Sequence, residues 1–477
     1  MNKKMRNRIT DISIFIVFMA FFGFLLITGE PLYLGDSFQH EMQFVTREPV
    51  YALLIQFLRW VSPEHHYWFI IIVQNILAVV TNTIFMCVVR REWKLKWPVL
   101  VLFVAILLSP HILTPIASAS GMVITNSLLS EGIAYSLYLF YVLYILKAIW
   151  RMESVGKDSM LAFFWAVFMS LVRGQFMILI LVWFLAMALI AFLQKRWKQI
   201  VVFVVMLAIA FVGRGLIVKT YNFCEQGLFV ATASGKAMSI ANVLYVADRE
   251  DGEAIEEEDL RTAYYEIFDR AYADGMNYQF SPDGLLARAA HHEDCHDSLN
   301  FDYFAVVAKE YVTATTGITV EDYQRMMVEV DKVAASLMAE LLPQVLLRYL
   351  YNYIAMVMMG FIRSVAFLHP IFNWYSFAIY LIAVILMIYV WMKKPCSKAA
   401  PFMALVLLII MGNVAGTSLM IQCISRYMLY NLPLFYMAGF LLLIDCFDIY
   451  NSKRHEKDKK LLERSDRKEE KEWDLEN

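Results

Sequence analysis

The chain has 477 residues, of which 60% are hydrophobic and only 18% are charged, and its mean hydropathy is +0.54. A soluble domain is roughly half apolar and a quarter charged. The composition therefore excludes an ordinary soluble enzyme, a disordered chain and a fibrous protein. The net charge of −2 gives no reason to expect a nucleic-acid partner, and the six cysteines are scattered. These features indicate a polytopic membrane protein.

Long apolar blocks alternate with basic loops along the chain. A membrane-spanning helix needs about 20 apolar residues, and cytoplasmic loops concentrate Lys and Arg. Basic residues flank the block 160–193 at both ends, and a single helix of that length would be about 51 Å long. We therefore expect a hairpin there, with its turn at Arg173-Gly174-Gln175 on the outer side. With this hairpin counted twice, the sequence predicts ten spans and cytoplasmic termini, the other spans being 10–28, 66–89, 98–117, 126–146, 199–218, 371–391, 400–421 and 430–448.

Three other segments are predicted to lie on the outer side. Residues 50–61 are too short to span and suit a helix in the membrane interface. Residues 219–343 are polar, and between 245 and 300 they carry fifteen acidic residues against four arginines, which favours an extracytoplasmic domain. Residues 344–368 are apolar, but a crossing there would place the later basic loops outside. We expect an interfacial or re-entrant helix in that segment.

The predicted fold class is an all-α polytopic membrane protein with about ten transmembrane helices. Interfacial helices lie in its first outer loop, and the extracytoplasmic insertion is mainly helical. The predicted domains are an N-terminal membrane domain with seven spans and the outer loop 29–65 (1–218), an acidic extracytoplasmic domain (219–343), an interfacial helix with three spans (344–450) and a charged cytoplasmic tail (451–477).

The first outer loop carries Asp36 just beyond the first span, at headgroup depth. A carboxylate at that depth is costly unless it is solvated or partnered, which makes it a functional candidate. If a helix begins at Ser37, His40 and Glu41 lie one turn away, so the three side chains could converge. The alternative is that Asp36 only caps this surface helix.

Three charged residues stand at the outer ends of later spans. Glu131 lies about one turn inside the fourth predicted span, where a buried carboxylate needs a proton, a cation or a hydrogen-bond donor. The alternative is that the positive end of its own helix favours it. Arg173 and Arg426 suit a lipid phosphate because arginine binds phosphate in a fork geometry. The alternative is two snorkelling arginines without a substrate role.

The acidic domain contains a dense group of polar residues, His291 to Asp297. Such a group could bind a divalent metal through His291, His292 and His296, but it matches no diagnostic zinc spacing. The alternative is a charged surface turn. The sequence names no cofactor and leaves a divalent metal ion open.

The order of these motifs resembles the GT-C superfamily of membrane glycosyltransferases, in its protein O-mannosyltransferase-like and aminoarabinose-transferase-like branch. The resemblance covers residues 1–218 and 370–448. Two departures from the family are a single acid followed by Ser in the first loop, and an outer domain that resembles no sugar-binding module. The motifs that carry the resemblance are Asp36, Arg47-Glu48-Pro49-Val50-Tyr51, Asn126 to Glu131, Arg173-Gly174-Gln175 (with Gly where Pro is usual), Arg426-Tyr427 with Asn431-Leu432-Pro433, and the insertion 219–343.

The resemblance implies an inverting transfer from a polyprenyl-phosphate sugar to a lipid, glycan or protein acceptor on the outer face of the cytoplasmic membrane. Asp36 would be the general base, and basic residues would meet the charge of the leaving phosphate. The predicted catalytic residues are Asp36, Glu41 and Glu131, and the predicted substrate-binding residues are His40, Arg47, Arg173, Lys219, Arg426 and Tyr427. An envelope-polysaccharide polymerase or ligase, a lipid or sugar transporter, and a non-catalytic structural membrane protein remain open as alternatives.

Overall fold

The computed structural model describes residues 3–117, 121–233, 235–366 and 371–476. Within these ranges the regular structure is helical, and the one β-bridge joins Leu32 and Ser127. This confirms the predicted all-α fold. Ten of the described helices are long and apolar enough to cross a membrane. The helices of the bundle are α1 (Lys3–Thr28), α4 (His66–Trp93), α5 (Trp97–Ala117), α6 (Glu131–Trp150), α7 (Lys157–Val172), α8 (Met177–Leu193), α9 (Trp197–Gln226), α15 (Phe372–Lys393), α16 (Ala399–Met420) and α18 (Leu432–Glu476).

Apolar side chains cover the outside of the bundle as well as its core. Val201 and Ile209 of α9 and Leu381 of α15 are each more than 60% exposed. Contiguous exposed apolar surface of this extent indicates contact with a membrane or a partner, and the length of the helices favours the membrane. The chain is thus a multi-pass membrane protein.

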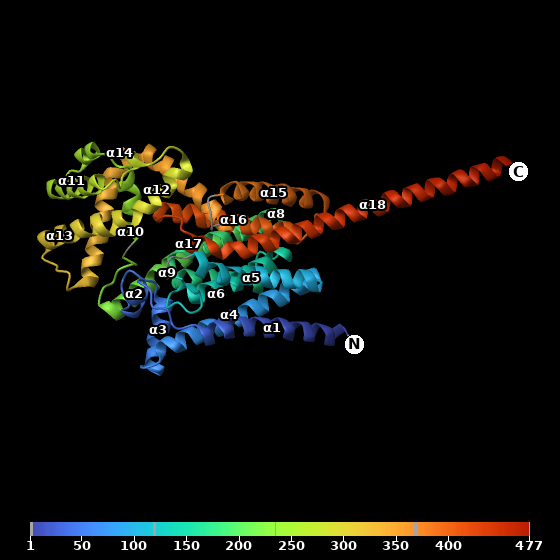
Figure 1. Ribbon diagram of the computed structural model, residues 1–477, viewed down its shortest axis with the longest axis horizontal. Helices are drawn as coiled ribbons and strands as arrows, with labels where there is room; N and C mark the ends of the chain where they lie inside the picture. The colour runs from blue at the N-terminus through green and yellow to red at the C-terminus, as the bar shows by residue number, and fades with distance from the viewer. Residues whose placement is uncertain (1–2, 118–120, 234, 367–370, 477) are drawn as a thin grey trace.

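Figure 1 shows both chain termini at one end of the long helices and the segment 227–343 at the other. We call these the terminal end and the insertion end. Ion pairs hold the helices together at the terminal end: Arg90 with Asp11 at 2.8 Å, and Lys394 with Asp445 at 2.6 Å. The carboxylates and arginines singled out in the sequence lie at the insertion end.

The predicted hairpin is present. Helix α7 ends at Val172, a 3₁₀ turn covers Gly174–Phe176, and α8 begins at Met177 and packs against α7. The ten apolar helices do not include α7, because its 16 residues are fewer than a span needs. They do include α14 (Tyr323–Val365), which was not predicted to span. The number of candidate spans therefore agrees with the prediction, but α14 takes the place of α7.

The second half of helix α14 packs against α15 and α16 of the bundle. The Tyr353 hydroxyl donates to the carbonyl of Ala415, near the last turn of α16, and the Tyr436 hydroxyl donates to the carbonyl of Val365. Pro343, which cannot donate a backbone hydrogen bond, lies between this part and the part packed within the insertion. The interfacial or re-entrant helix at 344–368 stays a prediction, and residues 367 and 368 lie outside the described residues.

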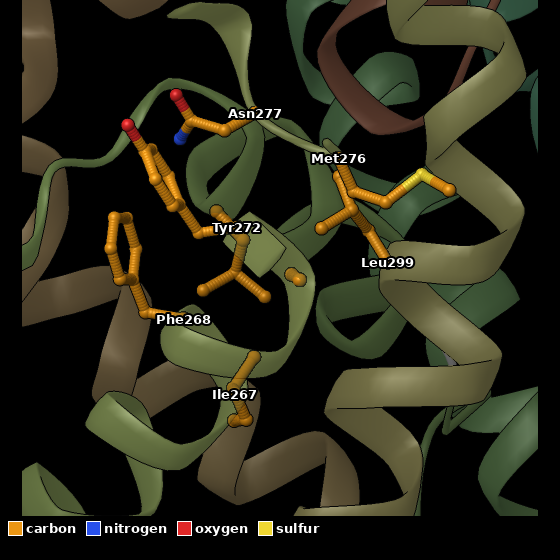
Figure 2. Close-up of a pocket in the computed structure, with 8 residues that line it drawn as sticks. Ile267, Phe268, Tyr272, Met276, Asn277 and Leu299 are labelled. Atoms are coloured by element: carbon orange, nitrogen blue, oxygen red, sulfur yellow. The ribbon is translucent and has the colours of Figure 1, made fainter. Parts of the chain in front are cut away.

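The insertion has a hydrophobic core of its own. Its helices are α10 (Gly235–Val246), α11 (Glu258–Ala273), α12 (Leu285–Ser298), α13 (Ala305–Thr316) and the first half of α14. Leu244, Phe304 and Leu337 are among the buried residues that pack together there. Figure 2 shows a mainly apolar pocket in this core, lined by residues that include Ile267, Phe268, Met276, Asn277 and Leu299. None of its lining residues belongs to the polar site described next.

Candidate active site at the insertion end

A backbone junction between two loops positions the site. The amide of Leu32 donates to the carbonyl of Asn126 at 2.8 Å, and the amide of Leu128 donates to Leu32 at 3.0 Å. Gln74 of α4 donates to the carbonyls of Thr125 and Ser127. Together these bonds place the first outer loop beside the start of α6.

This junction corrects the predicted fourth span, 126–146. Residues 126–130 belong to the loop that pairs with Leu32, so the helix begins at Glu131. Glu131 lies at the first residue of α6, rather than one turn inside it, and is still buried at 3% exposure.

Asp36 is held by two arginines from distant parts of the chain. Its Oδ1 lies 2.6 Å from Nη2 of Arg47, and its Oδ2 lies 3.1 Å from Nη2 of Arg426. Asp36 precedes helix α2 (Ser37–Glu41), but its side chain makes no capping hydrogen bond. The alternative of a simple helix cap is therefore not observed.

Glu131 forms the second half of the same cluster. Its Oε1 lies 2.5 Å from Nη1 of Arg173 and 3.8 Å from Nε of Arg426. Arg426 therefore lies between the two carboxylates. We call Asp36, Arg47, Glu131, Arg173 and Arg426 the carboxylate–arginine centre. Each had been singled out in the sequence, and residues 390 positions apart meet there.

The carboxylate–arginine centre has one more positive than negative charge, because three guanidinium groups face two carboxylates. The Tyr427 ring lies 4.8 Å from the Arg173 guanidinium and 5.1 Å from that of Arg426, and its hydroxyl accepts a hydrogen bond from Arg426. Nε of Arg426 is buried and has no hydrogen-bond partner among the described residues. This donor lies near Glu131 without bonding to it, and the centre carries an excess positive charge, so the arrangement favours an anionic ligand.

The electrostatics of the outer loop keep Asp36 ionised and His40 neutral. Burial raises the pKa of Asp36, but the charges of Arg47 and Arg426 outweigh burial and lower this pKa to about 2. Burial, reinforced by Arg47, lowers the pKa of His40 to about 3. His40 packs edge-on against Tyr51 at 5.0 Å and is a neutral neighbour of the carboxylate–arginine centre.

Two predicted site residues lie elsewhere. Glu41 pairs with Arg59 and accepts hydrogen bonds from the hydroxyls of Tyr33 and Tyr67, each at 2.9 Å. Successive helical residues project about 100° apart, so Glu41 cannot face the same side as His40. Lys219 lies over the ring of Phe229 at 5.7 Å and makes no ion pair with the carboxylate–arginine centre. The predicted convergence therefore holds for Asp36 and His40 and is wrong for Glu41.

The predicted metal site in the insertion is not formed. The described residues contain no group of three or more His, Cys, Asp or Glu that could hold a metal ion. His292 and His296 share the buried face of α12, whereas His291 faces Tyr245, whose hydroxyl lies 2.9 Å from its Nδ1. The segment is also helical rather than a charged surface turn.

Sequence reasoning gave no role to Glu48 or to residues of the insertion that border the carboxylate–arginine centre. Glu48 forms a buried ion pair with Arg214 of α9. Gln422, four residues before Arg426, donates to Asp297 of α12 at 3.0 Å. The only signal for Glu48 was its place beside Arg47, and nothing in the sequence names its partner.

No protein-family model, curated protein or solved structure matches this chain. The function is therefore argued from the carboxylate–arginine centre.

Proposed function

We propose that this protein is an integral-membrane glycosyltransferase that moves a sugar from a polyprenyl-phosphate donor to an envelope acceptor outside the cytoplasmic membrane. The observation that supports the proposal is the position of Arg426, which lies between Asp36 and Glu131 where the apolar helices end. Carboxylates and an arginine thus stand side by side at one end of the apolar helices, which supports a site for a lipid phosphate.

The arginines bind the phosphate of the donor in this proposal. Arginine offers a planar fork of donors that matches a phosphate, and Arg426 has a buried Nε without a hydrogen-bond partner. The excess positive charge offsets the negative charge that develops on the leaving phosphate. A fixed donor at such a position typically accelerates a reaction by roughly 10²–10³-fold. The polyprenyl chain would lie along the apolar helices.

Asp36 takes the proton of the acceptor. In the free site, arginines occupy both of its oxygens. A donor phosphate competes for Arg426 and leaves Oδ2 able to accept a proton. The acceptor hydroxyl oxygen then attacks the anomeric carbon, its proton passes to Asp36, and the bond from that carbon to the phosphate oxygen breaks with inversion. General-base assistance of this kind contributes about 10²–10⁴-fold.

The remaining residues orient the reacting groups. Glu131 holds Arg173 through its 2.5 Å ion pair, and Tyr427 lies against Arg173 and Arg426. His40, which is neutral, can orient an acceptor hydroxyl without adding charge. Asp297 of the insertion is close enough to Arg426 for their charges to interact, and its carboxylate accepts a hydrogen bond from Gln422.

Donor turnover tests the proposal. Purified protein in nanodiscs is given a panel of polyprenyl-phosphate sugars with candidate acceptors, and loss of sugar is followed for wild type and Asp36→Asn. Asp269→Asn is the matched control, because Asp269 pairs with Arg249 on the surface of the insertion. We expect one donor to be consumed by wild type and by the control but not by Asp36→Asn. Full turnover by folded Asp36→Asn protein contradicts the proposal.

A further inference from the structure

A second buried ion pair lies next to the carboxylate–arginine centre, because Glu48 directly follows Arg47 in the chain. This pair has no part in the chemistry proposed above. Glu48 precedes helix α3 (Pro49–Val61), and its carboxylate pairs with Arg214 of α9. The Thr232 hydroxyl donates to Glu48 at 3.2 Å, and Nε of Arg214 donates to the carbonyl of Ser170 at 3.3 Å. The pair therefore links the first outer loop, the hairpin, α9 and the start of the insertion.

This pair touches the two backbone segments that carry arginines of the carboxylate–arginine centre. Glu48 directly follows Arg47, and Gly174 directly follows Arg173. A Cβ atom at Gly174 would lie 3.1 Å from Oε1 of Glu48, which is closer than most side-chain contacts. The glycine thus leaves the room that the carboxylate occupies.

We propose that Glu48 and Arg214 are positioning residues that hold Arg47 and Arg173 in place to face Asp36 and Glu131. The consequence for sugar transfer rests on the proposed function, whereas the positioning itself does not. Both side chains are nearly buried, with 9% of Glu48 and 13% of Arg214 exposed. Removing one partner of such a pair leaves an uncompensated buried charge, which costs far more than removing both.

The effect of single substitutions should be local. Burial raises the pKa of Glu48, and the charge of Arg214 opposes this rise, so loss of the arginine would raise this pKa further. Glu48→Gln keeps the shape and leaves Arg214 without its counter-ion. The contact that joins the segments 42–48 and 170–176 is then weakened, because a neutral amide oxygen replaces the carboxylate that faces Arg214. The double variant Glu48→Gln/Arg214→Gln removes both charges and keeps two groups that can hydrogen-bond to each other.

Hydrogen exchange measured by mass spectrometry in nanodiscs tests the proposal without an activity assay. We expect Glu48→Gln and Arg214→Gln to speed exchange in 42–48 and 170–176 roughly tenfold. The double variant should exchange more slowly than either single variant. Asp445→Asn is the matched control, because it breaks the ion pair with Lys394 at the terminal end. Exchange at 42–48 and 170–176 should not change in that variant.

Gly174→Ala provides a second route if Glu48→Gln does not fold. It retains every charge and places a Cβ against the Glu48 carboxylate, so we expect faster exchange in the same two segments. The proposal would be overturned if hydrogen exchange in 42–48 and 170–176 did not change. It would also be overturned if exchange at the terminal end of the bundle became faster by the same factor.

Kinetics separate this proposal from the proposed function. Where wild type turns over a donor, Glu48→Gln should raise the KM for the donor and lower kcat/KM roughly 100-fold, the loss that a misplacement of about 1 Å can cause. Arg214→Gln should cause a similar loss, and Arg214→Lys, which keeps the charge, should lose less than Arg214→Gln. Where wild type turns over no donor, the proposed function fails, and the exchange result still decides the role of the pair. A donor KM equal to that of wild type in Glu48→Gln contradicts the positioning role.

Discussion

At the scale of single residues, Arg426 links the two carboxylates of the carboxylate–arginine centre. It is shared between Asp36 and Glu131, so a ligand that takes it changes the surroundings of both carboxylates. Arg426→Lys keeps the charge but loses the planar fork. We expect kcat/KM for the donor to fall roughly 10²–10³-fold. Steady-state kinetics of this variant beside Arg249→Lys, a surface arginine, check the prediction, and equal losses in both variants contradict it.

The pKa values of Asp36 and His40 in the outer loop predict that kcat/KM changes little with pH between about pH 5 and 8. With a pKa of about 2 for Asp36 and about 3 for His40, neither group changes charge in the free protein between about pH 5 and 8. The lowered pKa of Asp36 stabilises the fold above the unfolded value of 3.8, and this stabilisation is lost as the pH falls through about 2.

The pH profile of kcat/KM reports on the free enzyme. We expect wild type and His40→Gln to have profiles of the same shape between pH 5 and 8. An inflection that is present in wild type and absent from His40→Gln would show that His40 titrates in this range and would contradict the assignment.

At the scale of elements, the position of charged residues near the ends of the predicted spans singled out the candidate site residues. It did not predict which of these residues form ion pairs with one another. Asp36, Glu131, Arg173 and Arg426 were singled out because ionised groups are costly near the ends of apolar helices. Their pairing depends on contacts between segments far apart in the sequence, which no local pattern encodes. Glu41 was misplaced because the five-residue helix α2 directs it toward Arg59.

Tertiary contacts also explain the other two errors. The fourth span starts late because residues 126 and 128 pair with Leu32 and because Gln74 holds the carbonyls of 125 and 127. The segment 291–297 is polar in sequence, yet α12 packs against α10 and α14 and buries His292 and His296. Polarity alone predicted a surface turn or a metal site.

Gln74 offers a test at this scale. Its amide bridges two loop carbonyls and accepts from the Tyr51 hydroxyl at 3.0 Å, so Gln74→Ala leaves buried polar groups without partners. We expect the free energy of unfolding to fall by about 1–3 kcal/mol. Asn82→Ala on the same helix is the control, because Asn82 bonds only to its own helix at Ala78. Denaturant unfolding in detergent micelles measures both, and an equal loss contradicts the bridging role.

At the scale of the whole molecule, the insertion contacts both walls of the carboxylate–arginine centre. On one side, the amide of Ala233 donates to the carbonyl of Val45, and Gln324 accepts from the amide of Val45. On the other side, Arg363 joins Glu293 of α12 to the carbonyl of Cys423. Under the proposed function, the insertion would govern access of an acceptor from this position.

Two exposed cysteines allow a test of the proposed orientation. Cys224 lies near the insertion end of α9, and Cys396 lies in the loop between α15 and α16 at the terminal end. In variants that keep only one of these cysteines, we expect a membrane-impermeant maleimide to label Cys224 in intact cells. Cys396 should be labelled only after permeabilisation. The opposite pattern would place the carboxylate–arginine centre in the cytoplasm.

The anomeric configuration of the product tests the central claim most directly. Wild-type protein in nanodiscs is given a polyprenyl-phosphate sugar of known configuration with an acceptor, and the glycosidic product is examined by NMR. The account predicts release of polyprenyl phosphate and a product of inverted configuration, because one displacement at the anomeric carbon occurs with Asp36 as base. A product of retained configuration, or no release of polyprenyl phosphate from any donor by folded protein, would contradict it.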